Sequence, residues 1–149
     1  MYVTRYLNIY IPSNDNKFMK AKDHMNAYNE HREAINWAIN RGLLKSQRII
    51  GIHASRAIIE LFSAYLHEKN LINIGFQINH RWFKTEKVSQ RFPDFSGKDL
   101  VIKKLVELER EAENLVYGSQ KTEGEIKKVL NLFNETEKII QRIMKESGR

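Results

Sequence analysis

The residues best suited to chemistry in this chain lie on one narrow face of a long apolar segment, residues 48–69. At about 100° per residue, a helix would place six of its side chains within an arc of about 80°. These six, called the polar stripe below, are Ile49, His53, Arg56, Glu60, Ser63 and His67. Imidazole and guanidinium groups on one face favour an anion, so we interpret His53, Arg56 and Glu60 as a candidate binding site at a cleft or a dimer seam. The alternative is a solvated face on which Arg56 and Glu60 form an ion pair.

A second candidate site is the segment 79–84, where basic and aromatic side chains are interleaved. It carries His80, Arg81 and Lys84 around Trp82 and Phe83. Base stacking together with cationic contacts to phosphate is typical of proteins that bind nucleic acid. The alternative is that Trp82 and Phe83 plug the core while Arg81 and Lys84 stay in water.

The sequence offers little for metal binding or nucleophilic catalysis. It has no cysteine, and its seven glycines form no phosphate-binding loop. His24 and His31 lie seven residues apart, and no pair of histidines has the His-Glu-x-x-His spacing of helical zinc proteases. A G-x-S-x-G motif is absent. We therefore expect no metal, no cofactor and no serine or cysteine nucleophile.

Helices must position these residues, because apolar side chains recur at spacings of three and four along most of the chain. The pattern predicts long helices over residues 16–41, 46–70, 98–117 and about 122–146, with a short one over 81–90. Ser46 and Ser96 are expected to cap the helices over 46–70 and 98–117, and Thr122 with Glu125 matches a capping box for the last helix. The predicted core positions include Tyr28, Ile35, Ala38, Ile39, Leu100, Leu105, Leu108, Ala112, Leu115, Ile126, Val129, Phe133 and Ile140.

These elements predict an all-α fold, an antiparallel up-and-down bundle of four to five helices, because short connections favour antiparallel neighbours. The bundle would be one domain of residues 13–149, preceded by a short extended arm of residues 1–12. Apolar and tyrosine residues alternate in that arm, so it would form a strand with a second copy or pack as an arm. The arm and the apolar circumference of residues 48–69 together predict a homodimer.

The net charge of +7 is unevenly distributed. Residues 98–149 hold 11 basic and 10 acidic side chains, a difference of +1, so the other +6 lies before residue 98. Such an excess favours a polyanionic partner, and the alternative is a basic protein whose charge serves no partner. No run approaches 18 apolar residues and the first residues lack a signal-peptide pattern, so we expect a soluble cytoplasmic protein with no membrane segment.

The order of these parts resembles the HEPN superfamily of small helical domains. Residues 53–71, HASRAIIELFSAYLHEKNL, resemble the long second helix of that family, and residues 79–83 lie where the family often has a histidine-containing connector. Residues 108–118, LEREAENLVYG, resemble its R-N-x-L-V-H-G segment, which is followed by a capped last helix. The likeness covers about residues 20–145.

In nuclease members of that family, the arginine and histidine of this motif act on RNA phosphates. The matching positions here are Ala112 and Tyr117, and a looser alignment offers Arg110. Tyr117 cannot serve as an acid or base near neutrality, because a phenol titrates near pH 10. The resemblance therefore implies a family member whose nuclease motif is degenerate.

Our leading hypothesis is a non-catalytic HEPN-like domain that binds a nucleotide, a nucleic acid or a partner protein such as a nucleotidyltransferase. Its candidate binding residues are His53, Arg56, Glu60, His80, Arg81, Lys84, Arg110 and Tyr117. One alternative is a metal-independent ribonuclease that acts as a dimer, built from residues such as Arg110, Tyr117, His53 and Arg56. The other is a purely structural interaction protein.

Overall fold

A computed structural model describes residues 13–147, and the surroundings of side chains from residue 20 to residue 146. Within this part of the chain the structure contains helices and loops and no strand, which confirms the predicted all-α bundle. The predicted arm of residues 1–12 lies outside the described residues. The elements are α1 (Ser13–Arg41), α2 (Gln47–Glu68), the 3-10 helices η2 (His80–Trp82) and η3 (Glu86–Arg91), α3 (Lys98–Tyr117) and α4 (Glu123–Ser147).

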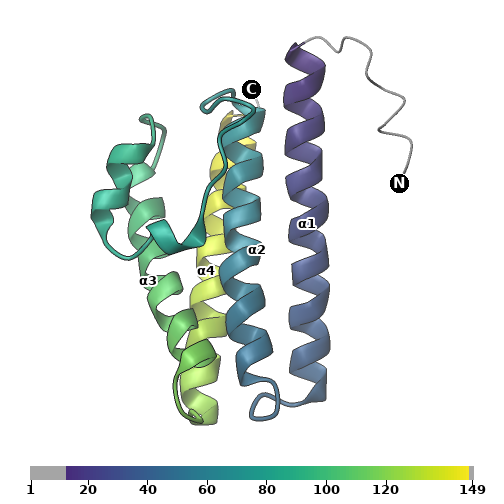
Figure 1. The fold of residues 1–149 in the computed structure, drawn as a ribbon, viewed down its shortest axis with the longest axis vertical. Helices are drawn as coiled ribbons and strands as arrows, with labels where there is room; N and C mark the ends of the chain where they lie inside the picture. Colours follow the sequence, from purple (N-terminus) through teal and green to yellow (C-terminus); the bar gives the residue numbers. More distant parts are fainter. Residues whose placement is uncertain (1–12, 148–149) are drawn as a thin grey trace.

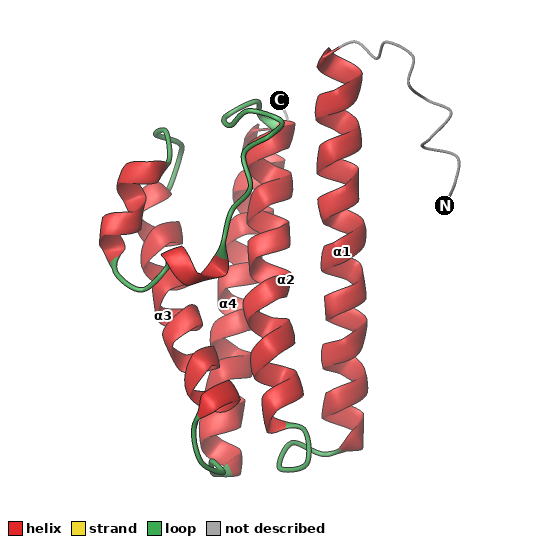
Figure 2. Ribbon diagram, viewed as in Figure 1, coloured by secondary structure: helices red, strands yellow, loops and turns green. Residues whose placement is uncertain are grey.

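Helix α2 stands in the middle of the bundle (Figure 1), with α1 on one side of it and α3 and α4 on the other. Successive long helices run in opposite directions, as the short turns after α1 and α3 require. The longer link between α2 and α3, residues 69–97, is called the connector below. It carries η2 and η3 along the side of the bundle near α3 (Figure 2).

The central position of α2 follows from its composition. Ile50, Ile58, Leu61, Phe62 and Leu66 are each at most 1% exposed. By length and composition alone α2 could cross a membrane, but 67% of its most apolar window is buried inside the bundle. Packing within a single chain therefore accounts for its apolar character. The homodimer stays a prediction, and α2 does not need a second copy to bury these five side chains.

The ends of the helices confirm one predicted cap and correct another. In the capping box of α4, the backbone N–H of Thr122 donates to Glu125 Oε1 at 2.9 Å, and the N–H of Glu125 donates to Thr122 Oγ1 at 3.1 Å. At the start of α3 the capping residue is Gly97, with φ of 77°, and not the predicted Ser96. Glycine adopts this left-handed conformation without the steric penalty that a side chain would add. Ser46 does precede α2, but its hydroxyl makes no hydrogen bond within the described chain.

Two residues predicted to lie in the core are exposed, and one predicted helix does not form. Ile39 is 40% exposed and Leu100 is 46% exposed, because they lie in the last turn of α1 and the first turn of α3, where the bundle ends. The predicted helix over residues 81–90 is replaced by η2 and η3. Phe83 and Val88 are both buried, and these anchors hold the two short segments on the bundle without a continuous helix.

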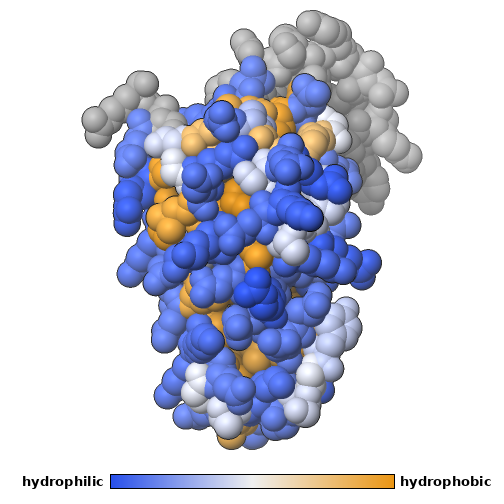
Figure 3. Space-filling model, turned by 90° about the vertical axis from the view of Figure 1, so that its left-hand side faces the viewer, coloured by the Kyte–Doolittle hydropathy of each residue, from blue (hydrophilic) through white to orange (hydrophobic). Residues whose placement is uncertain are grey.

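The surface on the side of α3 and the connector is mostly hydrophilic. Figure 3 shows this side, where apolar side chains reach the surface only in small separate patches. Phe76, Phe83 and Phe92 of the connector instead form an aromatic cluster with Phe62 of α2. The connector is thus fixed to α2 by packing.

We expect Leu61→Ala to lower the free energy of unfolding by about 2–5 kcal/mol, because it leaves a cavity on the buried side of α2. Urea denaturation at pH 7, followed by circular dichroism, measures this change. The control is Leu100→Ala, which should change stability by less than about 0.5 kcal/mol because the side chain is exposed. A loss below about 1 kcal/mol for Leu61→Ala would contradict the burial of α2.

Candidate functional site

The polar stripe of α2 does not face open solvent. Ser63 and His67 are buried, whereas His53, Arg56 and Glu60 are half-buried. No ion pair joins Arg56 to Glu60, because Glu60 is bonded instead to His24 of α1. Part of the polar stripe therefore borders a pocket beside the connector, and part of it lies in the interface with α1.

The pocket lies between α2 and the connector and has a volume of about 410 Å³. Its walls are Arg56, Ile59 and Glu60 of α2 and residues 77–82 of the connector. A smaller hollow adjoins it, since Arg56 and His80 line both, and it extends to Glu109 and Tyr117 of α3. Three of the chain's predicted binding segments thus meet at one place.

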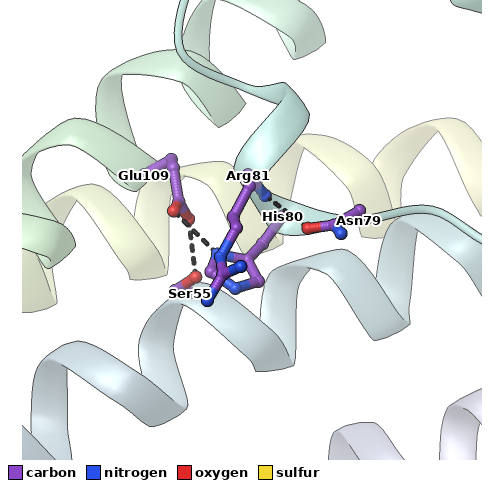
Figure 4. Close-up of polar contacts among 5 residues, drawn as sticks. All are labelled: Ser55, Asn79, His80, Arg81 and Glu109. Carbon is purple, nitrogen blue, oxygen red and sulfur yellow. Dashed lines mark hydrogen bonds and ion pairs between the residues drawn. The ribbon is translucent and has the colours of Figure 1, made fainter.

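A buried carboxylate organises the boundary between these two hollows (Figure 4). Glu109 is 7% exposed, and Ser55 Oγ donates to its Oε1 at 2.6 Å. His80 Nδ1 lies 2.8 Å from its Oε2. A carboxylate only accepts hydrogen bonds, so Nδ1 of His80 carries the proton. Each oxygen of the buried carboxylate therefore has a donor, as a charge in this position requires.

This arrangement fixes the orientation of His80. With Nδ1 bonded to Glu109, Nε2 is the ring nitrogen left for a ligand. The connector supports the same geometry, because the side chain of Asn79 accepts a hydrogen bond from the backbone N–H of Arg81 at 2.8 Å and caps η2. The pocket thus combines an oriented imidazole with the guanidinium groups of Arg56 and Arg81.

Gly51 allows the close approach of α2 and α3 on which the Ser55–Glu109 bond depends. A Cβ atom at this position would lie 2.8 Å from the carbonyl oxygen of Ala112 and 2.9 Å from Cβ of Leu115. Any side chain here would push the helices apart. Because Ser55 lies one turn further along α2, the same displacement would move it away from Glu109.

The other side of the stripe meets two histidines of α1. His31 Nδ1 lies 2.8 Å from His53 Nδ1, and His24 Nδ1 lies 2.5 Å from Glu60 Oε1. The rings of His24 and His67 are stacked, with centroids 5.2 Å apart and planes 9° apart. We call His24, His31, His53 and His67 the histidine seam. Four of the five histidines of the chain lie in it.

The predicted site residues thus have different locations. Arg56, Glu60, His80 and Arg81 line one pocket, and Tyr117 lines the adjoining hollow. His53 is directed to α1, and the exposed Lys84 and Arg110 line neither hollow. Phe83 is wholly buried and Trp82 is half-buried, so the alternative interpretation of segment 79–84 as a core plug holds for its aromatic residues.

The predicted site did not include Ser55 or Glu109, and His24 and His31 were considered only as possible metal ligands. The sequence does contain a signal for the burial of Glu109. This residue lies four positions after the buried Leu105 and three before the buried Ala112, and so on the apolar face of α3. A charged residue in a core stripe indicates a buried partner. Among the described residues, no three histidine, aspartate or glutamate side chains gather as a metal site would require.

The chain matches no known family model, and no curated protein and no solved structure is similar enough to count as a match.

We expect Ser55→Ala to lower the free energy of unfolding by about 1.5–3 kcal/mol, because it removes a hydrogen bond to a buried charged group. Thermal or urea denaturation at pH 7 checks this value. Ser96→Ala is the matched control. Ser96 is exposed and makes no capping bond to α3, so this substitution should change the free energy of unfolding by less than about 0.5 kcal/mol. Equal effects of the two substitutions would contradict the role assigned to Ser55.

Proposed function

We propose that this protein binds a phosphate group of a nucleotide or of single-stranded nucleic acid in the pocket between α2 and the connector. The observation that carries the proposal is the orientation of His80 by the buried Glu109, beside Arg56 and Arg81. A guanidinium group matches the oxygens of a phosphate, and Nε2 of His80 can accept a hydrogen bond from a hydroxyl group of the same ligand.

The charges of the pocket support an anionic ligand. Among the residues that the structure describes, no carboxylate lies within ion-pair distance of Arg56 or Arg81. Glu60 also lines the pocket, but it is bonded to His24, and Glu109 is bonded to His80. The two guanidinium groups are therefore the charges available to a ligand. Trp82 forms part of the wall and offers apolar surface next to them.

We propose further that the chain is a HEPN-like domain, with a nucleotidyltransferase as a candidate partner protein and a homodimer as its assembly. The order of four long helices and a histidine-containing connector agrees with what the resemblance implies. Ala112, at the position of the family's arginine, is wholly buried, and Tyr117 is 75% exposed. This placement favours binding over the family's catalytic role at these two positions.

We expect Arg81→Glu with Lys84→Glu to lower the affinity for a short fluorescently labelled single-stranded RNA by about tenfold or more at low salt, because cationic contacts are replaced by repulsion. The slope of log affinity against log salt concentration should fall by about 0.7 for each lost phosphate contact. Fluorescence anisotropy measures both quantities. Arg56→Gln should weaken binding in the same assay, because it removes a guanidinium group from the pocket.

The matched control is Lys127→Glu with Lys128→Glu, which makes the same change of charge on an exposed face of α4. It should reduce affinity less. Competition with inorganic phosphate and with AMP then separates a phosphate or nucleotide site from a longer nucleic-acid surface. Equal losses in both double variants, or no binding at low salt, would refute the proposed pocket.

A second candidate function is metal-independent RNA cleavage, and the Glu109–His80 pair is the observation that favours it. A carboxylate that orients an imidazole is the arrangement of a general base. His80 would accept the proton of the 2′-hydroxyl group as that oxygen attacks phosphorus, and Arg56 and Arg81 would stabilise the charge on the phosphate oxygens. The 5′-oxygen would leave and take a proton from water.

We expect no cleavage of single-stranded RNA by the purified protein with a chelator present, because His80 is the oriented acid–base group of the pocket and Glu60, which could protonate the leaving oxygen, is bonded to His24. Gel analysis of labelled RNA tests this. Cleavage that is abolished by His80→Ala would establish the second candidate function. Cleavage abolished by His53→Ala or Arg110→Ala would instead support a site assembled between two copies.

A further inference from the structure

The inner face of α1 repeats every three and four residues, as in a helical bundle seam. The positions are Ala21, His24, Tyr28, His31, Ile35 and Ala38. Tyr28, Ile35 and both alanines are buried, so this face is the one that packs on the bundle. Two of its six positions are histidine, a residue whose charge changes between pH 5 and pH 8.

Helix α2 presents His53, Glu60 and His67 to this face, each seven residues from the next. Because the helices are antiparallel, His53 meets His31, whereas Glu60 and His67 meet His24. The bond between His31 Nδ1 and His53 Nδ1 needs one nitrogen without a proton, so it breaks if both rings become charged. His67 is 1% exposed, and neither of its ring nitrogens finds a hydrogen-bond partner among the described residues.

The groups that face His67 do not offset its burial. Burial lowers the pKa of His67 to about 4, and the adjacent His24 and Lys20 act in the same direction. The main chain of Phe76, on the connector, acts weakly in the opposite direction, because it lies near the ring without forming a hydrogen bond to either nitrogen.

The His31–His53 pair behaves in the same way. Burial also lowers the pKa of His31 and of His53, and Arg56 adds to both effects. Glu60 and Glu30 favour a charged His31, but burial outweighs them.

Outside the seam, the buried contacts of α1 are made by a few apolar side chains, among them Tyr28, Ile35 and Ala38. It packs mainly against α2, and Figure 1 shows it along the outer side of that helix. Its polar tie to α4 consists of Tyr28 and Arg32, which both bond to Glu137. Burial and the bond to Glu137 raise the pKa of Tyr28 to about 12, so Tyr28 does not titrate in acid. Helices α2, α3 and α4 supply most of the buried residues of the apolar core, to which α1 adds Tyr28, Ile35 and Ala38.

We propose that the histidine seam is an acid-sensitive latch: below about pH 6, protonation of His31, His53 and His67 releases α1 from α2 while α2, α3 and α4 stay packed. A histidine whose pKa is lower in the folded state stabilises that state above its unfolded pKa of about 6.5. The stabilisation is lost as the pH falls toward the folded pKa. In this window the released state binds more protons, and the opening equilibrium rises by up to about tenfold per pH unit for each histidine that titrates.

The test uses spin labels on cysteines introduced into the cysteine-free chain. One pair replaces the exposed Asn29 of α1 and Lys138 of α4, and the control pair replaces the exposed Lys103 of α3 and Lys138. Distances are measured at pH 7 and pH 5 by pulsed electron paramagnetic resonance. We expect the distance between the first pair to lengthen and its distribution to broaden at pH 5, and both changes to reverse at pH 7. The distance between the control pair should stay unchanged.

The variant His67→Leu removes the most deeply buried titrating ring, and it should lower the pH at which α1 opens. His80→Gln, which removes the histidine outside the seam, should leave that pH unchanged. Hydrogen exchange of α1, compared with that of α3 at the same pH, provides a measurement that needs no labels. The latch is refuted if α1 stays docked at pH 5 or if the distances of both label pairs change together. It is also refuted if α1 of the His67→Leu variant opens at the same pH as α1 of the unmodified chain.

Discussion

The burial of α2 on several sides is the constraint on which the rest of this structure depends. On a helix in that position, a polar side chain without a partner is costly, because a buried polar group that loses its hydrogen bond to water costs free energy. Three polar residues of α2 have a partner on another element: Ser55 bonds to Glu109, His53 to His31, and Glu60 to His24. His67 is the exception, because neither of its ring nitrogens is bonded within the described residues. The arrangement of α1, α3 and the connector around α2 follows these contacts as well as the apolar packing.

The bundle could be predicted from the sequence because its signals are local. The spacing of apolar residues predicts α3 over 98–117, and the structure has it at Lys98–Tyr117. The Thr122–Glu125 box identifies the start of α4, because both of its bonds lie within one turn. Leu100 shows the limit of such reasoning. It continues the apolar spacing of α3, but periodicity does not reveal where neighbouring helices stop covering a face.

The candidate site could be predicted only in part. Arg56, Glu60, His80 and Arg81 were identified by residue type and local spacing, and they line one pocket. Their partners could not be found in this way. The bond from Ser55 to Glu109 joins residues 54 positions apart. The pairing of His31 with His53 depends on how closely α1 and α2 pack against each other. Such contacts are set by tertiary packing, to which Gly51 contributes by allowing α2 and α3 to approach closely.

The Glu109–His80 pair bears on the choice between a binding protein and a purely structural one. Burying a carboxylate is costly, and replacing a buried ion pair by apolar residues of similar volume is often neutral or stabilising. Glu109 occupies a core position of α3, where an apolar side chain would pack against Ser55 and Ala112 at no such cost. Stability alone therefore gives a weak reason for a carboxylate there. Its orientation of an imidazole at the edge of a pocket that also contains two arginines gives a stronger one, and this supports ligand binding over a purely structural role.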